Sequence, residues 1–115
     1  MTTSNRELLE LAAKAAGIEG DYVSWCYDGF REGIRKPKDN HRRPWNPLTE
    51  DDDALRLAVK LGLRVSERVA EVWKDGKETA YFFEDDGNPY TATRRAIVRA
   101  AAKLGETSVE IGKTL

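Results

Sequence analysis

Apolar residues recur along this chain at two spacings, one typical of helices and one typical of strands. Spacings of three and four residues predict helices over residues 5–16, 50–61 and 89–104. Alternating aromatic and β-branched residues predict two β-hairpins, Asp21–Tyr27 with Phe30–Arg35 and Arg64–Trp73 with Thr79–Phe83. The order α-β-β-α-β-β-α predicts an α+β domain, in which an antiparallel sheet from two hairpins is covered by three short helices.

Each predicted helix is preceded by a residue whose side chain can accept a hydrogen bond from the first turn. These N-caps are Ser4, Thr49 and Asn88, and Glu7 and Asp52 stand in the capping-box position of the first two. The starts of all three helices are therefore marked in the sequence.

Glycines follow the helices and predict their ends, because glycine readily adopts the left-handed conformation of a helix C-cap. They are Gly17, Gly62 and Gly105. Residues 1–105 are accordingly predicted to form one domain, and residues 106–115 a weakly ordered tail. The apolar stripe of the central helix is predicted to face the core, and it consists of Ala54, Leu55, Leu57, Ala58, Val59 and Leu61.

Two Asp-Gly pairs predict the hairpin turns, at Asp28 and at Asp75. In the second hairpin the alternation slips between Val65 and Val69, which predicts a β-bulge or a late start of the strand.

Composition limits the class of protein. A chain of 115 residues with 19 basic and 20 acidic residues is expected to be one domain, and its global charge does not favour nucleic acid. Cys26 is the only cysteine, so an internal disulfide is excluded and a reducing compartment is expected. The chain lacks a signal-peptide pattern and a membrane-length apolar run. We expect a bacterial cytoplasmic location and no membrane partner.

The segment before the central helix is locally basic. Residues 36–44 contain no apolar residue except proline, which predicts a mobile surface loop. The wider segment Arg31–Arg43 carries the basic residues Arg31, Arg35, Lys36, Lys38, Arg42 and Arg43 against two acidic ones. Together with His41 and the nearby Trp45 this favours nucleic acid, since cations neutralise phosphates and an aromatic ring can stack on a base. Arg94, Arg95 and Arg99 would extend the patch; the alternative is a solvated loop beside a polar helix face.

Enzymatic chemistry has little support in the sequence. The acidic clusters Glu50–Asp53 and Glu84–Asp86 could suggest a metal, but helix-dipole complementation explains the first and a solvated turn the second. His41 lies in a polar loop, and Cys26 lies among aromatic residues that favour packing. The chain has no glycine-rich phosphate loop or nucleophile elbow. We therefore expect no enzyme and no cofactor.

One part of the chain resembles a known family. It includes Trp45–Thr49, the helix opening at Asp53–Leu55 and ending in Leu-Gly-Leu, and the segment Pro89–Ala102. Over roughly Trp45 to Gly105 the chain is similar to the phage ABA sandwich domain, a layered α/β/α module encoded by tailed phages and prophages. The resemblance implies a phage or prophage origin and action in the bacterial cytoplasm. It implies no catalytic residues.

These observations favour a small non-enzymatic phage accessory protein that binds a host or phage protein. A host defence or regulatory complex is one such partner. Trp25, Trp45 and Trp73 could anchor an interface, although we expect at least two of the three to be buried in the core. The alternative is a nucleic-acid-binding protein that uses the loop Arg31–Arg43.

Overall fold

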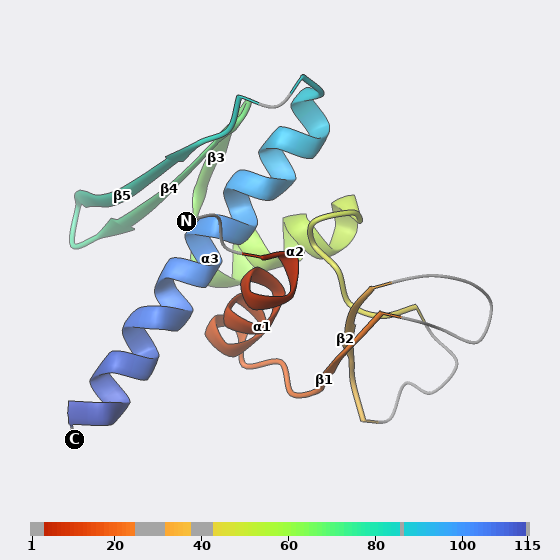
Figure 1. Cartoon of the computed structure of the whole chain (residues 1–115). Coiled ribbons are helices and arrows are strands. Elements are labelled where there is room, and N and C mark those ends of the chain that lie inside the picture. Colours follow the sequence, from red (N-terminus) through yellow and green to blue (C-terminus); the bar gives the residue numbers. More distant parts are fainter. Residues whose placement is uncertain (1–3, 25–31, 38–42, 86, 115) are drawn as a thin grey trace.

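The structure is a computed structural model that describes residues 4–24, 32–37, 43–85 and 87–106, and the backbone alone over 107–114. It confirms an α+β fold built from antiparallel strands and three helices (Figure 1). The elements are α1 (Asn5–Ala16), β1 (Asp21–Val23), β2 (Gly33–Arg35), α2 (Asp51–Leu61), β3 (Arg64–Ser66), β4 (Val69–Lys74), β5 (Lys77–Phe83) and α3 (Pro89–Thr114). The strands form two separate sheets, β1-β2 and β3-β4-β5.

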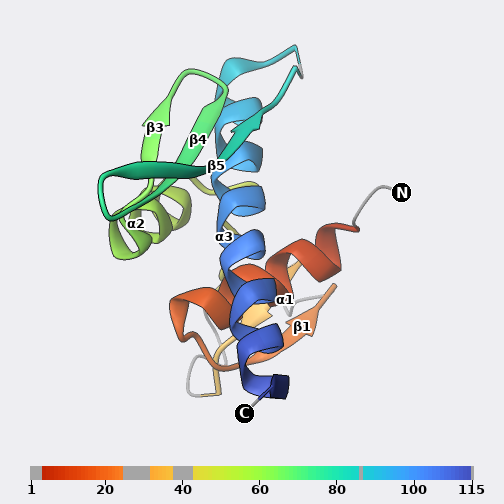
Figure 2. The ribbon, with the colours of Figure 1, turned by 90° about the vertical axis from the view of Figure 1, so that its left-hand side faces the viewer.

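Helix α3 runs through the middle of the molecule, and the other elements are arranged around it (Figures 1 and 2). The β3-β4-β5 sheet packs on its first half, α1 crosses its second half, and α2 packs beside it. The core lies between these elements and is rich in alanine. Its buried members on α3 include Ala92, Ala96, Ile97, Val98, Ala100 and Ala101.

Gly105 does not end α3, so the predicted helix end is wrong. The helix continues to Thr114. Gly105 is buried where α1 crosses α3, and a Cβ there would overlap the carbonyl of Leu11. This glycine allows the close approach of two helices because it has no side chain, whereas a C-cap glycine is favoured for its left-handed backbone conformation.

Other local signals are confirmed. Ser4 Oγ accepts a hydrogen bond from the amide of Glu7 (3.2 Å). Gly17 and Gly62 both adopt the left-handed conformation, with φ of 70° and 67°. Asn88 Oδ1 accepts from the amides of Tyr90 and Thr91, at 2.8 and 3.2 Å. These ends form locally, so short stretches of sequence are enough to predict them.

The slip in the second hairpin marks a turn between two strands. Arg68, with φ of 65°, lies in the turn that separates β3 from β4. The predicted strand Arg64–Trp73 is therefore two antiparallel strands, and the sheet gains a third member. The β4-β5 turn at Asp75 and Gly76 is confirmed by their φ values of 54° and 76°. A register shift does occur, but between Val72 and Trp73.

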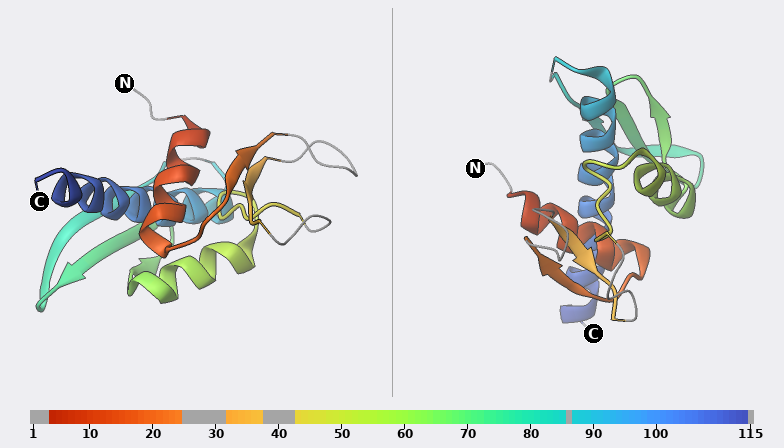
Figure 3. Two further views of the ribbon diagram at one scale, coloured as in Figure 1. Left: turned by 90° about the horizontal axis from the view of Figure 1, so that it is seen from below. Right: turned by 90° about the vertical axis from the view of Figure 1, so that its right-hand side faces the viewer.

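The β1-β2 hairpin lies beside α1, away from the other sheet (Figure 3). Its described ladder pairs Asp21 with Arg35 and Val23 with Gly33, while the expected turn at Asp28 falls outside the described residues. Ile34 and Trp45 exchange backbone hydrogen bonds of 2.8 Å in each direction. The C-terminal end of the predicted surface loop is thereby held against β2, and Pro44 is buried.

Helix α2 differs from its prediction in two respects. Glu50 occupies the N-cap position without a side-chain capping bond, while the Thr49 hydroxyl lies within hydrogen-bond distance of the Asn46 carbonyl (3.5 Å) and the Glu50 carboxylate (3.3 Å). Leu55 and Val59 are exposed, so the buried stripe is narrower than predicted. Ala54, Leu57 and Ala58 are its buried members.

Candidate functional site

Arg43, one of the cations predicted to contact a partner, instead pairs with carboxylates of its own chain. Its guanidinium donates to Asp53 Oδ2 through Nη1 (2.7 Å) and to both carboxylate oxygens of Asp52 through Nη2 (2.9 and 2.8 Å). Glu50 lies at 3.9 Å from Nε. Arg43 therefore ties the end of the basic loop to the first turn of α2, and three carboxylates compensate its charge.

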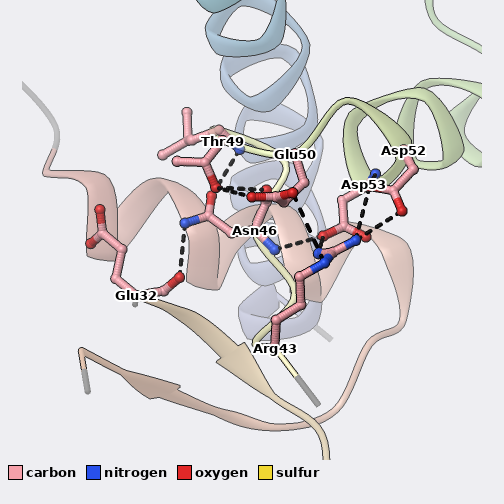
Figure 4. Close-up of polar contacts among 8 residues, drawn as sticks. Glu32, Arg43, Asn46, Thr49, Glu50, Asp52 and Asp53 are labelled. Carbon is pink, nitrogen blue, oxygen red and sulfur yellow. Dashed lines mark hydrogen bonds and ion pairs between the residues drawn. The ribbon is translucent and has the colours of Figure 1, made fainter. Parts of the chain in front are cut away.

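Asn46 is the centre of this arrangement, which we call the Asn46 corner (Asn46, Asp53, Arg43 and Glu32; Figure 4). Its backbone amide donates to Asp53 Oδ2 (3.0 Å), and its side-chain amide donates to the carbonyl of Glu32 (2.9 Å). Its Oδ1 accepts from the amide of Leu48 (2.9 Å). Asn46 and Asp53 are both buried, and burial of such groups is tolerated because they have partners.

The pKa values of Arg43 and of its partner Asp52 are both shifted toward the charged forms. The hydrogen bond to Asp53 raises the pKa of Arg43, although burial acts in the opposite direction. Desolvation opposes ionisation of Asp52, but the amide of Asp53 and the charges of Arg43 and Arg56 lower the pKa of Asp52. The ionised form of the Asp52 carboxyl is thus favoured by a backbone amide and by arginines.

The three predicted arginines of α3 are also paired. Arg94 donates to Asp51 Oδ1 (2.6 Å) and to the carbonyl of Leu48 (2.9 Å). Arg95 and Arg99 both contact the carboxylate of Glu84, and the Arg99 guanidinium also lies over the Phe82 ring. The side chain of Glu84 is mostly buried. The prediction of a solvated turn at Glu84–Asp86 is therefore wrong for Glu84. Each of the three arginines on α3 therefore contacts a carboxylate, and two of them share Glu84.

The remaining predicted contacts divide into two groups. Arg35 is half-buried at the end of β2, and Lys36 beside it is exposed. Arg31, Lys38, His41 and Arg42 lie outside the described residues, as do Cys26 and Trp25. Of the other two tryptophans, Trp45 is buried and Trp73 is half-buried.

The β3-β4-β5 sheet has an inner and an outer face. Ala70 and Val72 point inward to α3, so their neighbours along β4 point outward. Cross-strand pairing places Phe83 beside Val69 and Tyr81 beside Glu71 on that side. We call this surface the outer face; it consists of Arg64, Val69, Glu71, Trp73, Glu78, Tyr81 and Phe83.

The outer face combines large rings with opposite charges. Tyr81 is 57% exposed and Phe83 is 50% exposed. The Arg64 guanidinium lies 3.8 Å from the centroid of the Trp73 ring, and the Trp73 indole donates to Glu71 (3.3 Å). A hydrogen bond with Glu71, reinforced by repulsion between the two carboxylates, raises the pKa of Glu78.

Sequence reasoning did not identify the outer face as a site. The indication available was that Thr79–Phe83 lacks alternation between polar and apolar residues, so both faces of β5 carry apolar side chains. A strand that is apolar on both faces is either buried on both or exposes one. Only the position of α3, on one side of the sheet, reveals that the second alternative holds.

Comparisons with protein-family models, curated proteins and solved structures find no match for this chain. Within the described residues, no helix combines the length and apolarity needed to cross a membrane. Over the same residues, no group of three or more histidine, cysteine or acidic side chains is arranged to hold a metal ion. The evidence for function therefore comes from the two regions described above.

Proposed function

We propose that this chain is a small non-enzymatic accessory protein of a phage or prophage that binds a host protein in the bacterial cytoplasm. The observation that supports binding is the outer face, where the side chains of Tyr81 and Phe83 are about half-exposed. The phage origin, and a host defence or regulatory complex as the partner, follow from the resemblance over Trp45–Gly105.

The chemistry of the outer face favours a protein partner. Exposed tyrosine and tryptophan rings contribute much of the binding energy in protein interfaces, because they bury large areas with few rotatable bonds. Arg64 and Glu71 lie on the same surface and supply charges of both signs beside the rings. A polyanion would instead require uncompensated cations, whereas Arg43, Arg94, Arg95 and Arg99 all contact carboxylates.

The experiment is a comparison of captured partners between two double variants. Tyr81→Thr with Phe83→Thr removes both rings and keeps strand propensity, while Leu55→Gln with Val59→Gln removes two exposed apolar side chains from α2. A host protein captured by the wild type and the α2 variant, but lost with the sheet variant, would then be purified and its affinity measured. Equal capture by all three proteins contradicts the proposal.

The rival function is nucleic-acid binding by the loop Arg31–Arg43, and exposed Lys36 at the edge of that loop supports it. Its test replaces Lys36, Lys38 and Arg42 by glutamine and retains Arg43, whose loss would disturb the Asn46 corner. Binding of single- or double-stranded DNA that weakens with salt and disappears in the triple variant would favour the rival. Absence of DNA binding at low salt would remove it.

A further inference from the structure

One ring of the outer face already holds a cation of the same chain. Arg64 lies opposite Glu71 in the strand register, but its guanidinium is placed over the Trp73 ring, 3.8 Å from the ring centroid. At this distance a cation is attracted to the electron-rich face of an indole. The Trp73 indole in turn donates to the Glu71 carboxylate (3.3 Å). A ring beside a carboxylate therefore accommodates a guanidinium on this surface.

Tyr81 provides a second ring beside carboxylates, and no cation occupies it. Its ring is more than half exposed, and the strand register places it directly opposite Glu71 on the same face. Glu78 pairs with Trp73, so it is the diagonal neighbour of Glu71 across the two strands. Within the described residues, Tyr81 has no cation over its ring, and neither Glu71 nor Glu78 takes part in an ion pair.

The other charges of this hairpin do not compensate the two carboxylates. The exposed charged residues at the β4-β5 turn are Lys74, Asp75 and Lys77. Strand alternation places Lys74 and Lys77 on the side of the hairpin opposite Glu78. The pKa of Glu78 agrees with this placement. It is raised by the hydrogen bond with Glu71, by desolvation and by the charge of Glu71, and no cation in the described part of the chain contributes to it.

We infer that the host protein docks on the outer face through an arginine, whose guanidinium lies on the Tyr81 ring and pairs with Glu71 and Glu78. A planar guanidinium can stack on a ring and donate to two carboxylates at once, which the compact ammonium of lysine cannot do. Val69 and Phe83, the next cross-strand pair, offer an apolar contact to the residues beside that arginine. The inference rests on the proposed function and deepens it, because it gives the chemistry of the partner's contact residue.

The first test uses a small probe and does not require the host protein. N-acetyl-arginine amide is titrated into the full chain, and N-acetyl-citrulline amide, a neutral analogue of the same shape, is the matched control at equal ionic strength. NMR follows the Tyr81 ring protons and the backbone amides of β4 and β5. The arginine probe should produce saturable shifts at Tyr81, Glu71 and Glu78, with half-saturation on the order of 10 to 100 mM. The citrulline probe should not.

Variants of the full chain separate the two carboxylates from general charge effects. Glu71→Gln with Glu78→Gln keeps the size of both side chains and removes their charge, and it should abolish the saturable shifts at Tyr81. Asp75→Asn is the matched control, because it removes an exposed carboxylate from the turn of the same hairpin. Asparagine tolerates the left-handed conformation of that position, so the turn is kept. Circular dichroism verifies that each variant is folded.

The second test uses the purified host protein captured through the outer face. Its affinity should fall at least about 10-fold in the double glutamine variant, because a partner arginine then lacks both acceptors. The affinity should stay unchanged in Asp75→Asn. Binding that weakens with salt in the wild type, and no longer does so in the double variant, would further support the pairing.

Two outcomes overturn the inference. One is equal behaviour of the arginine and citrulline probes, and the other is an unchanged affinity of the host protein for the double glutamine variant. If the host protein still depends on Tyr81 and Phe83 in that case, the proposed function stands and only the arginine contact is excluded. If the arginine probe binds as expected and no host protein is captured, the proposed function fails and the guanidinium site stands.

Discussion

The side chains of the Asn46 corner and those of the outer face lie in contrasting environments. In the corner, the polar side chains of Arg43, Asn46 and Asp53 are satisfied within the molecule. On the outer face, Tyr81 and Phe83 stay half-exposed although they are large and mainly apolar. Charge in the corner thus stabilises the fold, whereas the outer face presents exposed rings beside charges of both signs.

The largest expected effect tests the corner. Asp53→Ala should lower the free energy of unfolding by about 3 kcal/mol, because it leaves the buried amide of Asn46 and part of Arg43 without an acceptor. Asp51→Ala is the control, since the Asp51 side chain is 77% exposed against 8% for Asp53. It should cost less than about 1 kcal/mol. Urea unfolding measures both, and equal losses would show that the corner is no more important than a surface ion pair.

A smaller effect tests the geometry of Arg43. Arg43→Lys keeps the positive charge but removes the planar fork that reaches Asp52 and Asp53 together. We expect a loss of about 1 kcal/mol in the free energy of unfolding, because one ammonium cannot reproduce bidentate pairing. Unchanged stability in urea would mean that charge alone holds the loop to α2.

Substitutions on the outer face should affect partner binding more than stability. Replacing Tyr81 and Phe83 together by threonine should change the free energy of unfolding by less than about 1 kcal/mol, because both rings are already half in water and threonine keeps strand propensity. Partner binding should nevertheless be lost, as measured by titration with the purified partner. A large loss of stability would show instead that the rings belong to the core.

The smallest effects concern pH, and they should have opposite signs in the two regions. The pKa of Asp52 lies below its ordinary value of 3.8, so its contribution to stability is present above pH 3.8 and is lost as the pH falls through the folded-state pKa. The pKa of Glu78 lies above 4.5, so its contribution is present below pH 4.5 and is lost as the pH rises through the folded-state pKa.

Asp52→Asn should therefore flatten the loss of stability in acid. Glu78→Gln should remove a decline that occurs as the pH rises above 4.5. Urea unfolding at a series of pH values measures both slopes. Slopes that change in the same direction would contradict the assignment of opposite shifts to the two carboxyl groups.

The sequence by itself determined the features that depend on a few neighbouring residues. The caps at Ser4, Gly17 and Asn88, and the turn at Asp75, all involve bonds within about one turn of chain, so local chemistry is sufficient to predict them. The α+β class also followed, because helical and strand periodicities differ and their order along the chain is visible.

Only the tertiary structure decided the roles that depend on distant neighbours. Gly105 lies inside α3, at a point where Leu11, far away in the sequence, approaches it too closely for a Cβ. Arg43 and Arg94 form ion pairs within the molecule, because the fold brings Asp52 and Asp53 close to Arg43 and Asp51 close to Arg94. The outer face emerged because α3 covers one side of the sheet. A sequence records which side chains are available, but pairing and exposure depend on which surfaces meet in three dimensions.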